Sequence, residues 1–113
     1  MKKAVVIGGS NGIGLAISKN LIERGYFLEI CDRSGPEEGI LPGHSFHHNY
    51  CDLLDFNEEL LSSLAADKDM EVLMVTAGIG RVADFQAHHL AEIEKILTVD
   101  TVSTIKIFRI FYD

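Results

Sequence analysis

The sequence predicts an α/β fold, in which a parallel sheet of about four strands lies between two layers of helices. Short apolar runs rich in β-branched residues alternate along the chain with segments whose apolar residues recur at helical spacing. Crossovers of this length connect parallel strands and place helices on both faces of the sheet. The expected strand order is 3-2-1-4, one half of a doubly wound architecture.

The four expected strands are Ala4–Ile7, Phe27–Cys31, Ser45–Cys51 and Glu71–Val75. Between the first two, apolar residues from Ile13 to Leu21 recur at helical spacing, and Gly25 provides a helix stop. The stretch 34–43 is rich in glycine and proline, which predicts a degenerate crossover without a helix.

Two further helices are expected in the second half of the chain. Asp55 and Glu58 have the spacing of a capping box, which predicts a helix that begins there. A long helix is expected from about His88 to Phe111. Its predicted core-facing stripe contains Asp100 together with Thr104 and the apolar residues Leu90, Ile93, Leu97, Ile107, Phe108 and Phe111.

Length and composition limit the class of protein. The 113 residues fit a single domain, 1–113, and the 47% apolar and 24% charged residues are typical of a globular chain. Ten basic against 17 acidic residues give a net charge of −7, which argues against nucleic acid and anionic membranes as partners. No apolar stretch approaches the length of a membrane span, and two cysteines make no disulfide framework. We therefore expect a cytoplasmic protein.

The first expected strand runs into the first helix through a glycine-rich turn, Ile7-Gly8-Gly9-Ser10-Asn11-Gly12-Ile13-Gly14. Gly8 would permit the tight turn, Gly12 would let the backbone approach a pyrophosphate, and Gly14 would let the helix lie close to the strand. A turn of this kind without a ligand is the alternative. The residues expected to contact pyrophosphate and adenosine are Gly8, Ser10, Asn11, Gly12 and Ile13.

Asp32 ends the second expected strand, 18 residues after Gly14. A carboxylate there is placed to accept hydrogen bonds from the hydroxyls of an adenosine ribose, and it would repel a 2′-phosphate. The predicted cofactor is therefore NAD. Arg33 leaves NADP open, because a guanidinium can pair with a 2′-phosphate. A solvated strand end is the alternative interpretation of Asp32.

The spacing Gly-x-x-x-Gly-x-Gly resembles the short-chain dehydrogenase/reductase family, whose cofactor domain is Rossmann-like. Further landmarks follow in order, namely Asp52-Leu53 after the third expected strand and Ala77-Gly78-Ile79 after the fourth. The resemblance implies that Asp52 and Leu53 hold the adenine ring. It places Ala77, Gly78 and Ile79 on the nicotinamide side of the cofactor.

The chain departs from this family at several positions. Thr76 stands where the family usually has an asparagine that ties the central strands together. Asp100 occupies the position of the asparagine in the family's proton relay, and it is the single catalytic-type position expected here. The family's catalytic serine and Tyr-x-x-x-Lys pair have no counterpart in these residues, because neither Tyr26 nor Tyr50 is followed by lysine at that spacing.

The resemblance therefore implies the cofactor half of an oxidoreductase that acts on small alcohol or carbonyl compounds, without its chemical half. Three functions remain open. The chain is part of an active NAD-dependent enzyme, a non-catalytic dinucleotide-binding module, or a structural, oligomerising module. The apolar segment that ends at Phe111 favours a homo-oligomer, as in the family.

The cysteines, the adjacent histidines and Arg81 give weaker indications of function. Cys31 and Cys51 precede Asp32 and Asp52 on neighbouring strands, where reduced thiols are favoured over a redox or metal pair. The adjacent histidine pairs cannot chelate well, and no metal site is expected. Arg81 follows the fourth strand, and a solvated loop arginine is favoured over a ligand contact.

Overall fold

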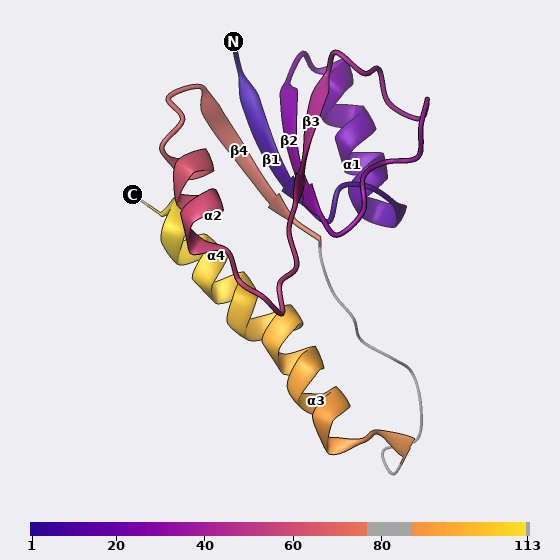
Figure 1. Ribbon diagram of the computed structural model, residues 1–113. Coiled ribbons are helices and arrows are strands. Elements are labelled where there is room, and N and C mark those ends of the chain that lie inside the picture. Colours follow the sequence, from indigo (N-terminus) through magenta and orange to yellow (C-terminus); the bar gives the residue numbers. More distant parts are fainter. Residues whose placement is uncertain (77–86, 113) are drawn as a thin grey trace.

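Four parallel strands form the sheet of the computed structural model, which describes residues 1–76 and 87–112. The strands are β1 (Lys3–Ile7), β2 (Phe27–Asp32), β3 (Phe46–Tyr50) and β4 (Met70–Val75). They lie side by side in the order β3-β2-β1-β4 (Figure 1). The predicted order 3-2-1-4 and the Rossmann-like α/β fold are confirmed.

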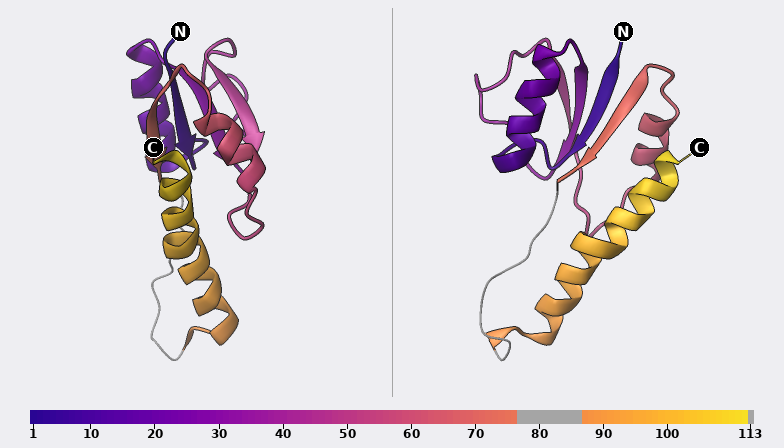
Figure 2. Two further views of the ribbon diagram at one scale, coloured as in Figure 1. Left: turned by 90° about the vertical axis from the view of Figure 1, so that its left-hand side faces the viewer. Right: turned by 180° about the vertical axis from the view of Figure 1, so that it is seen from behind.

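Helices cover both faces of the sheet. Helix α1 (Gly12–Glu23) lies on one face, and α2 (Glu58–Ala65) and α4 (Ser103–Phe111) lie on the other (Figure 2). Side chains of successive β1 residues point alternately into two hydrophobic cores, one on each face of the sheet. Ala4 and Val6 belong to a cluster on the α1 side, whereas Val5 and Ile7 pack with residues of α2 and α4. Burial on both faces explains why β1 is apolar from Ala4 to Ile7.

No helix or strand forms between Asp32 and Phe46, so the predicted degenerate crossover is confirmed. Leu41 lies within this crossover and is buried with Leu28 and Ile30 of β2. Leu41, together with the partly buried Ile40, therefore covers part of the sheet that a crossover helix would cover. Elsewhere in the crossover, Gly35 approaches the ring of His48 on the edge strand β3.

The expected capping box between Asp55 and Glu58 is wrong. Asn57 is the N-cap of α2, and its Oδ1 accepts a hydrogen bond from the Leu60 amide at 3.0 Å. The Asp55 amide instead donates to the Asp52 carbonyl at 2.9 Å, which closes a tight turn. Asparagine and aspartate cap helices about equally well, so the turn at Asp52 decides where α2 begins.

The C-terminal helical run has three parts: α3 (Leu90–Leu97), a π-helical segment (Thr98–Val102) and α4. A π turn holds more residues than an α turn, and the buried positions Val99, Ser103 and Ile107 recur every four residues. The predicted core-facing stripe is therefore partly wrong. Leu90, Leu97 and Phe108 are 83%, 54% and 51% exposed, and Asp100 is exposed as well. Within the described ranges, no helix is long and apolar enough to cross a membrane.

Replacing Leu61 tests how far the sheet depends on α2. Leu61 is fully buried against the sheet, so Leu61→Ala should lower the free energy of unfolding by about 2–5 kcal/mol. The matched control is Leu97→Ala, which truncates an exposed leucine and should cost less than about 0.5 kcal/mol. Urea denaturation measures both values, and equal losses would contradict the described packing.

Candidate functional site

A cavity of about 500 Å³ lies at the carboxyl ends of the strands. The glycine turn, the ends of β2 and β3 and one side of α3 enclose it. Open α/β sheets bind ligands at this edge, where the chain crosses from one face to the other. The lining residues are Ile7, Gly8, Asn11, Gly12, Ile13, Gly14, Cys31, Asp32, Arg33, Cys51, Asp52, Leu53, Leu54, Thr76, Lys95 and Val99.

The glycine turn brings the start of α1 against the end of β1. Gly8 has a φ of 87°, and Gly12 has a φ of 55° with open space beside it. A Cβ at Gly14 would stand only 1.9 Å from the Gly8 carbonyl oxygen, so only glycine fits this crossing. The Ser18 hydroxyl is within hydrogen-bond distance of the carbonyls of Gly9 and Gly14, at 3.1 and 2.9 Å.

The N-terminus of α1 opens toward the cavity. Asn11 is its N-cap but makes no capping hydrogen bond through its side chain, and both Asn11 and Gly12 line the cavity. The first amides of a helix have no partner within the helix. Their N–H groups and the positive end of the helix dipole favour an anion such as a phosphate.

The carboxylate of Asp32 is held by two backbone amides. The Arg33 amide donates to Oδ1 at 2.8 Å, and the Ser10 amide donates to Oδ2 at 3.3 Å. His48 holds the same residue from β3, with its Nε2 3.0 Å from the Asp32 carbonyl oxygen. Each carboxylate oxygen keeps a further lone pair that can accept a hydrogen bond from a ligand hydroxyl.

Ser10 supplies an observation that favours a ligand. Its hydroxyl is buried, and no hydrogen-bond partner for it exists among the described residues. A buried polar group without a partner is costly unless something absent from the protein itself satisfies it. The amides at the start of α1 can donate to a phosphate and the Asp32 carboxylate can accept from ribose hydroxyls, so these groups suit a ligand that carries both.

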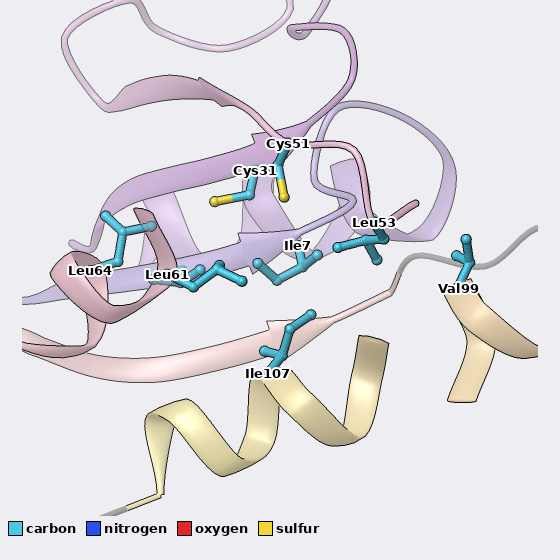
Figure 3. Close-up of a cluster of buried hydrophobic side chains, with 9 residues drawn as sticks. Ile7, Cys31, Cys51, Leu53, Leu61, Leu64, Val99 and Ile107 are labelled. Carbon is cyan, nitrogen blue, oxygen red and sulfur yellow. The ribbon is translucent and has the colours of Figure 1, made fainter. Parts of the chain in front are cut away.

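The Asp52–Leu54 turn forms another wall. Oδ1 of Asp52 accepts a hydrogen bond from the Leu54 amide at 2.9 Å. Leu53 is buried in the core cluster that also contains Val99 (Figure 3). Its carbonyl accepts a hydrogen bond from the Ser103 hydroxyl at 2.8 Å. Leu53 and Val99 thus give this end of the cavity an apolar floor.

Thr76, directly after β4, connects the central strands β4 and β1 through hydrogen bonds. Its hydroxyl is 3.0 Å from the Ile7 carbonyl oxygen and 3.1 Å from that of Gly8, and its amide donates to Ile7 at 2.9 Å. One donor hydrogen is therefore shared between the last residue of β1 and the first glycine of the turn. The substitution of threonine for the family's asparagine keeps a connection between β4 and β1.

Most of the predicted binding residues lie together. Gly8, Asn11, Gly12, Ile13, Gly14, Asp32, Arg33, Asp52 and Leu53 all line the cavity. Ser10 is buried in the same turn, whereas Asp100 is not among the described lining residues. Ala77, Gly78, Ile79 and Arg81 lie outside the described residues.

Two cavity residues, one on α3 and one on the helical segment after it, were not predicted from the sequence. Lys95 and Val99 line the cavity and stand four residues apart, so they share one side of the helical run. The four-residue spacing is visible in the sequence. Nothing in the sequence indicates, however, that this side of the helical run would pack near the Asp52–Leu54 turn.

The two thiols lie at the strand ends beside Ile7 and Leu53 (Figure 3). Both cysteines are free and buried, as expected for reduced thiols. Burial raises the pKa of Cys31, the neighbouring Cys51 raises it further, and burial likewise raises the pKa of Cys51. Thiolates are the reactive form, so these cysteines are poor nucleophiles. Among the residues described, no three metal-ligating side chains come together.

The comparison with family models identifies the chain. A model described as short chain dehydrogenase matches residues 2–113. The protein therefore belongs to the short-chain dehydrogenase family. A curated relative, the 5′-hydroxyaverantin dehydrogenase of Emericella nidulans, is 33% identical over 67 residues, which cover 58% of this chain and 22% of that protein.

Solved structures show the same fold. A protein from Beutenbergia cavernae, solved with bound NADP at low occupancy, is 26% identical with a TM-score of 0.85, and the match covers 97% of this chain and 47% of that one. The short chain dehydrogenase of Leptospira borgpetersenii with bound NAD+ is 21% identical with a TM-score of 0.81, covering 98% and 45%. The chain thus spans less than half the length of either structure.

Substituting Gly14 tests the crossing of α1 over β1. Gly14→Ala should lower the free energy of unfolding by about 2 kcal/mol or more, because the backbone of Gly8 would have to move. Each kcal/mol lost should lower Tm by about 4–8 °C. Gly43→Ala is the matched control, since a Cβ there meets no atom within 4 Å. Calorimetry measures both, and a Gly14→Ala variant as stable as the control would contradict the described turn.

The raised thiol pKa values predict a pH dependence of stability. The unfolded chain loses its thiol protons at lower pH than the folded chain does. The contribution of the protonated thiols to the free energy of unfolding is therefore present at neutral pH and is lost as pH rises above about 9. For Cys31 the slope should approach about 1.4 kcal/mol per pH unit. Urea unfolding from about pH 8 to 10 measures it. A Cys31→Ala variant with an equally steep profile would show that another group is responsible.

Proposed function

We propose that these residues form the cofactor-binding half of an NAD(P)-dependent oxidoreductase, with the dinucleotide bound across the carboxyl ends of the strands. One observation carries this proposal. The approach of Gly14 to the Gly8 carbonyl sets the open N-terminus of α1 beside the Asp32 carboxylate, in one cavity of about 500 Å³. The family assignment and the relatives with bound NAD+ or NADP support it.

The pyrophosphate is assigned to the turn between β1 and α1. Amides at the start of α1 donate to the phosphate oxygens, and the open space beside Gly12 admits them. The Ser10 hydroxyl, which has no partner among the described residues, gains one from the ligand. The Asn11 and Ile13 side chains border the same space.

Asp32 is assigned to the adenosine ribose. Its position between the Ser10 and Arg33 amides fixes the carboxylate and leaves lone pairs for the ribose hydroxyls. A negative charge at that point disfavours a 2′-phosphate, so we propose NAD as the preferred cofactor. Arg33 lines the same cavity and allows NADP to bind more weakly.

The nicotinamide of the bound cofactor supplies hydride transfer with a small alcohol or carbonyl compound. Ala77, Gly78 and Ile79 are proposed for the nicotinamide side, and Asp100 for the family's relay position. The sequence contains no Tyr-x-x-x-Lys pair to move the substrate proton. Removing such an acid–base group typically lowers the rate by about 10²–10⁴, so we propose cofactor binding without useful turnover by these residues alone.

A structural, oligomerising module is the second candidate, and one observation favours it. Ile105 and Phe108 of α4 are exposed apolar residues on the helical run that covers the sheet. An exposed apolar face favours association with another protein surface. This function predicts a stable oligomer whose melting temperature does not respond to nucleotides. Light scattering with and without NAD separates it from the first candidate.

Thermal melting with NAD and with NADP tests the proposed function. Ligand at about 100 times its Kd should stabilise the fold by about 2.7 kcal/mol and raise Tm by several degrees, more with NAD than with NADP. Asp32→Asn should shrink the NAD shift and enlarge the NADP shift. Asp69→Asn, an exposed carboxylate away from the cavity, is the matched control and should change neither. No shift with either nucleotide would contradict dinucleotide binding.

A further inference from the structure

We propose that Lys95 is a specificity-determining residue that recognises the purine base of the bound dinucleotide through a hydrogen bond from its ammonium group. This inference rests on the proposed function and deepens it. The family resemblance assigns the base to Asp52 and Leu53, but no motif in the sequence points to Lys95. Its position in the cavity carries the argument.

Lys95 lines the cavity from α3, and Val99 lines it from the helical segment that follows. The Lys95 side chain is exposed, and the described part of the chain gives it no hydrogen bond or ion pair. By contrast, the cavity's two carboxylates both accept hydrogen bonds from backbone amides. The ammonium of Lys95 therefore remains available to a ligand at this end.

The surroundings of Lys95 suit a flat, aromatic ring. Leu53 and Val99 are buried and form the apolar floor, and the partly exposed Leu54 borders the same space. Val99 stands one helical turn after Lys95, so the floor and the ammonium come from one side of the helical run. Ligand sites commonly combine apolar walls with a few polar groups that fix orientation, and this end of the cavity has that composition.

The polar groups here complement adenine. Asp52 Oδ1 is engaged by the Leu54 amide, and the second oxygen of the carboxylate remains to accept a hydrogen bond. Lysine offers only donors. Adenine presents an amine donor next to a ring-nitrogen acceptor. An acceptor from Asp52 and a donor from Lys95 match that edge, whereas Asp52 alone could not distinguish adenine from another amino-substituted base.

The experiment measures the Kd of NAD by calorimetric titration of the intact chain and three lysine variants. Lys95→Met keeps the length of the side chain but removes the donor, and should weaken NAD binding about fivefold. Lys95→Gln retains a donor without the charge and should recover most of the affinity. Lys19→Met removes an exposed lysine of α1 away from the cavity and should match the unsubstituted chain.

Adenosine, which has no phosphate, completes the test. Its affinity, followed by NMR titration, should fall by the same factor in Lys95→Met. If NAD binds the unsubstituted chain and Lys95→Met equally well, the inference fails while the proposed function stands. If Lys95→Gln is as weak as Lys95→Met and adenosine is unaffected, the ammonium acts on phosphate and base recognition is wrong. If NAD does not bind the unsubstituted chain, both fail.

Discussion

The crossing of α1 over the end of β1 is the constraint on which the site depends. Gly14 leaves no room for a side chain against the Gly8 carbonyl, and the Thr76 hydroxyl holds that same carbonyl from β4. Ser18 adds contacts to the carbonyls of Gly9 and Gly14 from within the helix. Three elements therefore meet at one turn, and the N-terminus of α1 lies beside the strand ends. The proposed phosphate site is thus a product of backbone packing.

The sheet could be predicted from the sequence because a strand buried on both faces leaves an unambiguous pattern. Val5 and Val6 face opposite cores, so β1 is apolar from Ala4 to Ile7, and most of β2 is apolar as well. Asp32 marks where β2 leaves the core. In a parallel sheet these ends meet at one edge, and therefore the glycine turn, Asp32 and Asp52 could be placed in one site before the structure was known.

The sequence was less informative where hydrogen bonding competes with periodicity. The π-helical segment places Val99 and Ser103 toward the core, one position away from the stripe that an uninterrupted α-helix predicts. Asp100 is consequently exposed. Asn57 rather than Asp55 caps α2, because the Asp55 amide already closes the turn at Asp52. Lys95 was not predicted as a cavity residue for a related reason, because its position at the cavity depends on which loop α3 packs against. Contacts between elements decide such features, and the spacing of residues within one element does not reveal them.

A net charge of −7 and a proposed anionic cofactor are compatible because the charge that matters is local. A nucleic-acid partner would require many cationic side chains along a surface, whereas a single pyrophosphate requires only helix amides and their dipole. Backbone amides also stabilise the Asp32 and Asp52 carboxylates, so within residues 1–76 and 87–112 these carboxylates do not pair with Arg33 or Lys95. Composition counts charged side chains but not oriented amides. For this fold, an acidic composition is therefore compatible with a dinucleotide ligand.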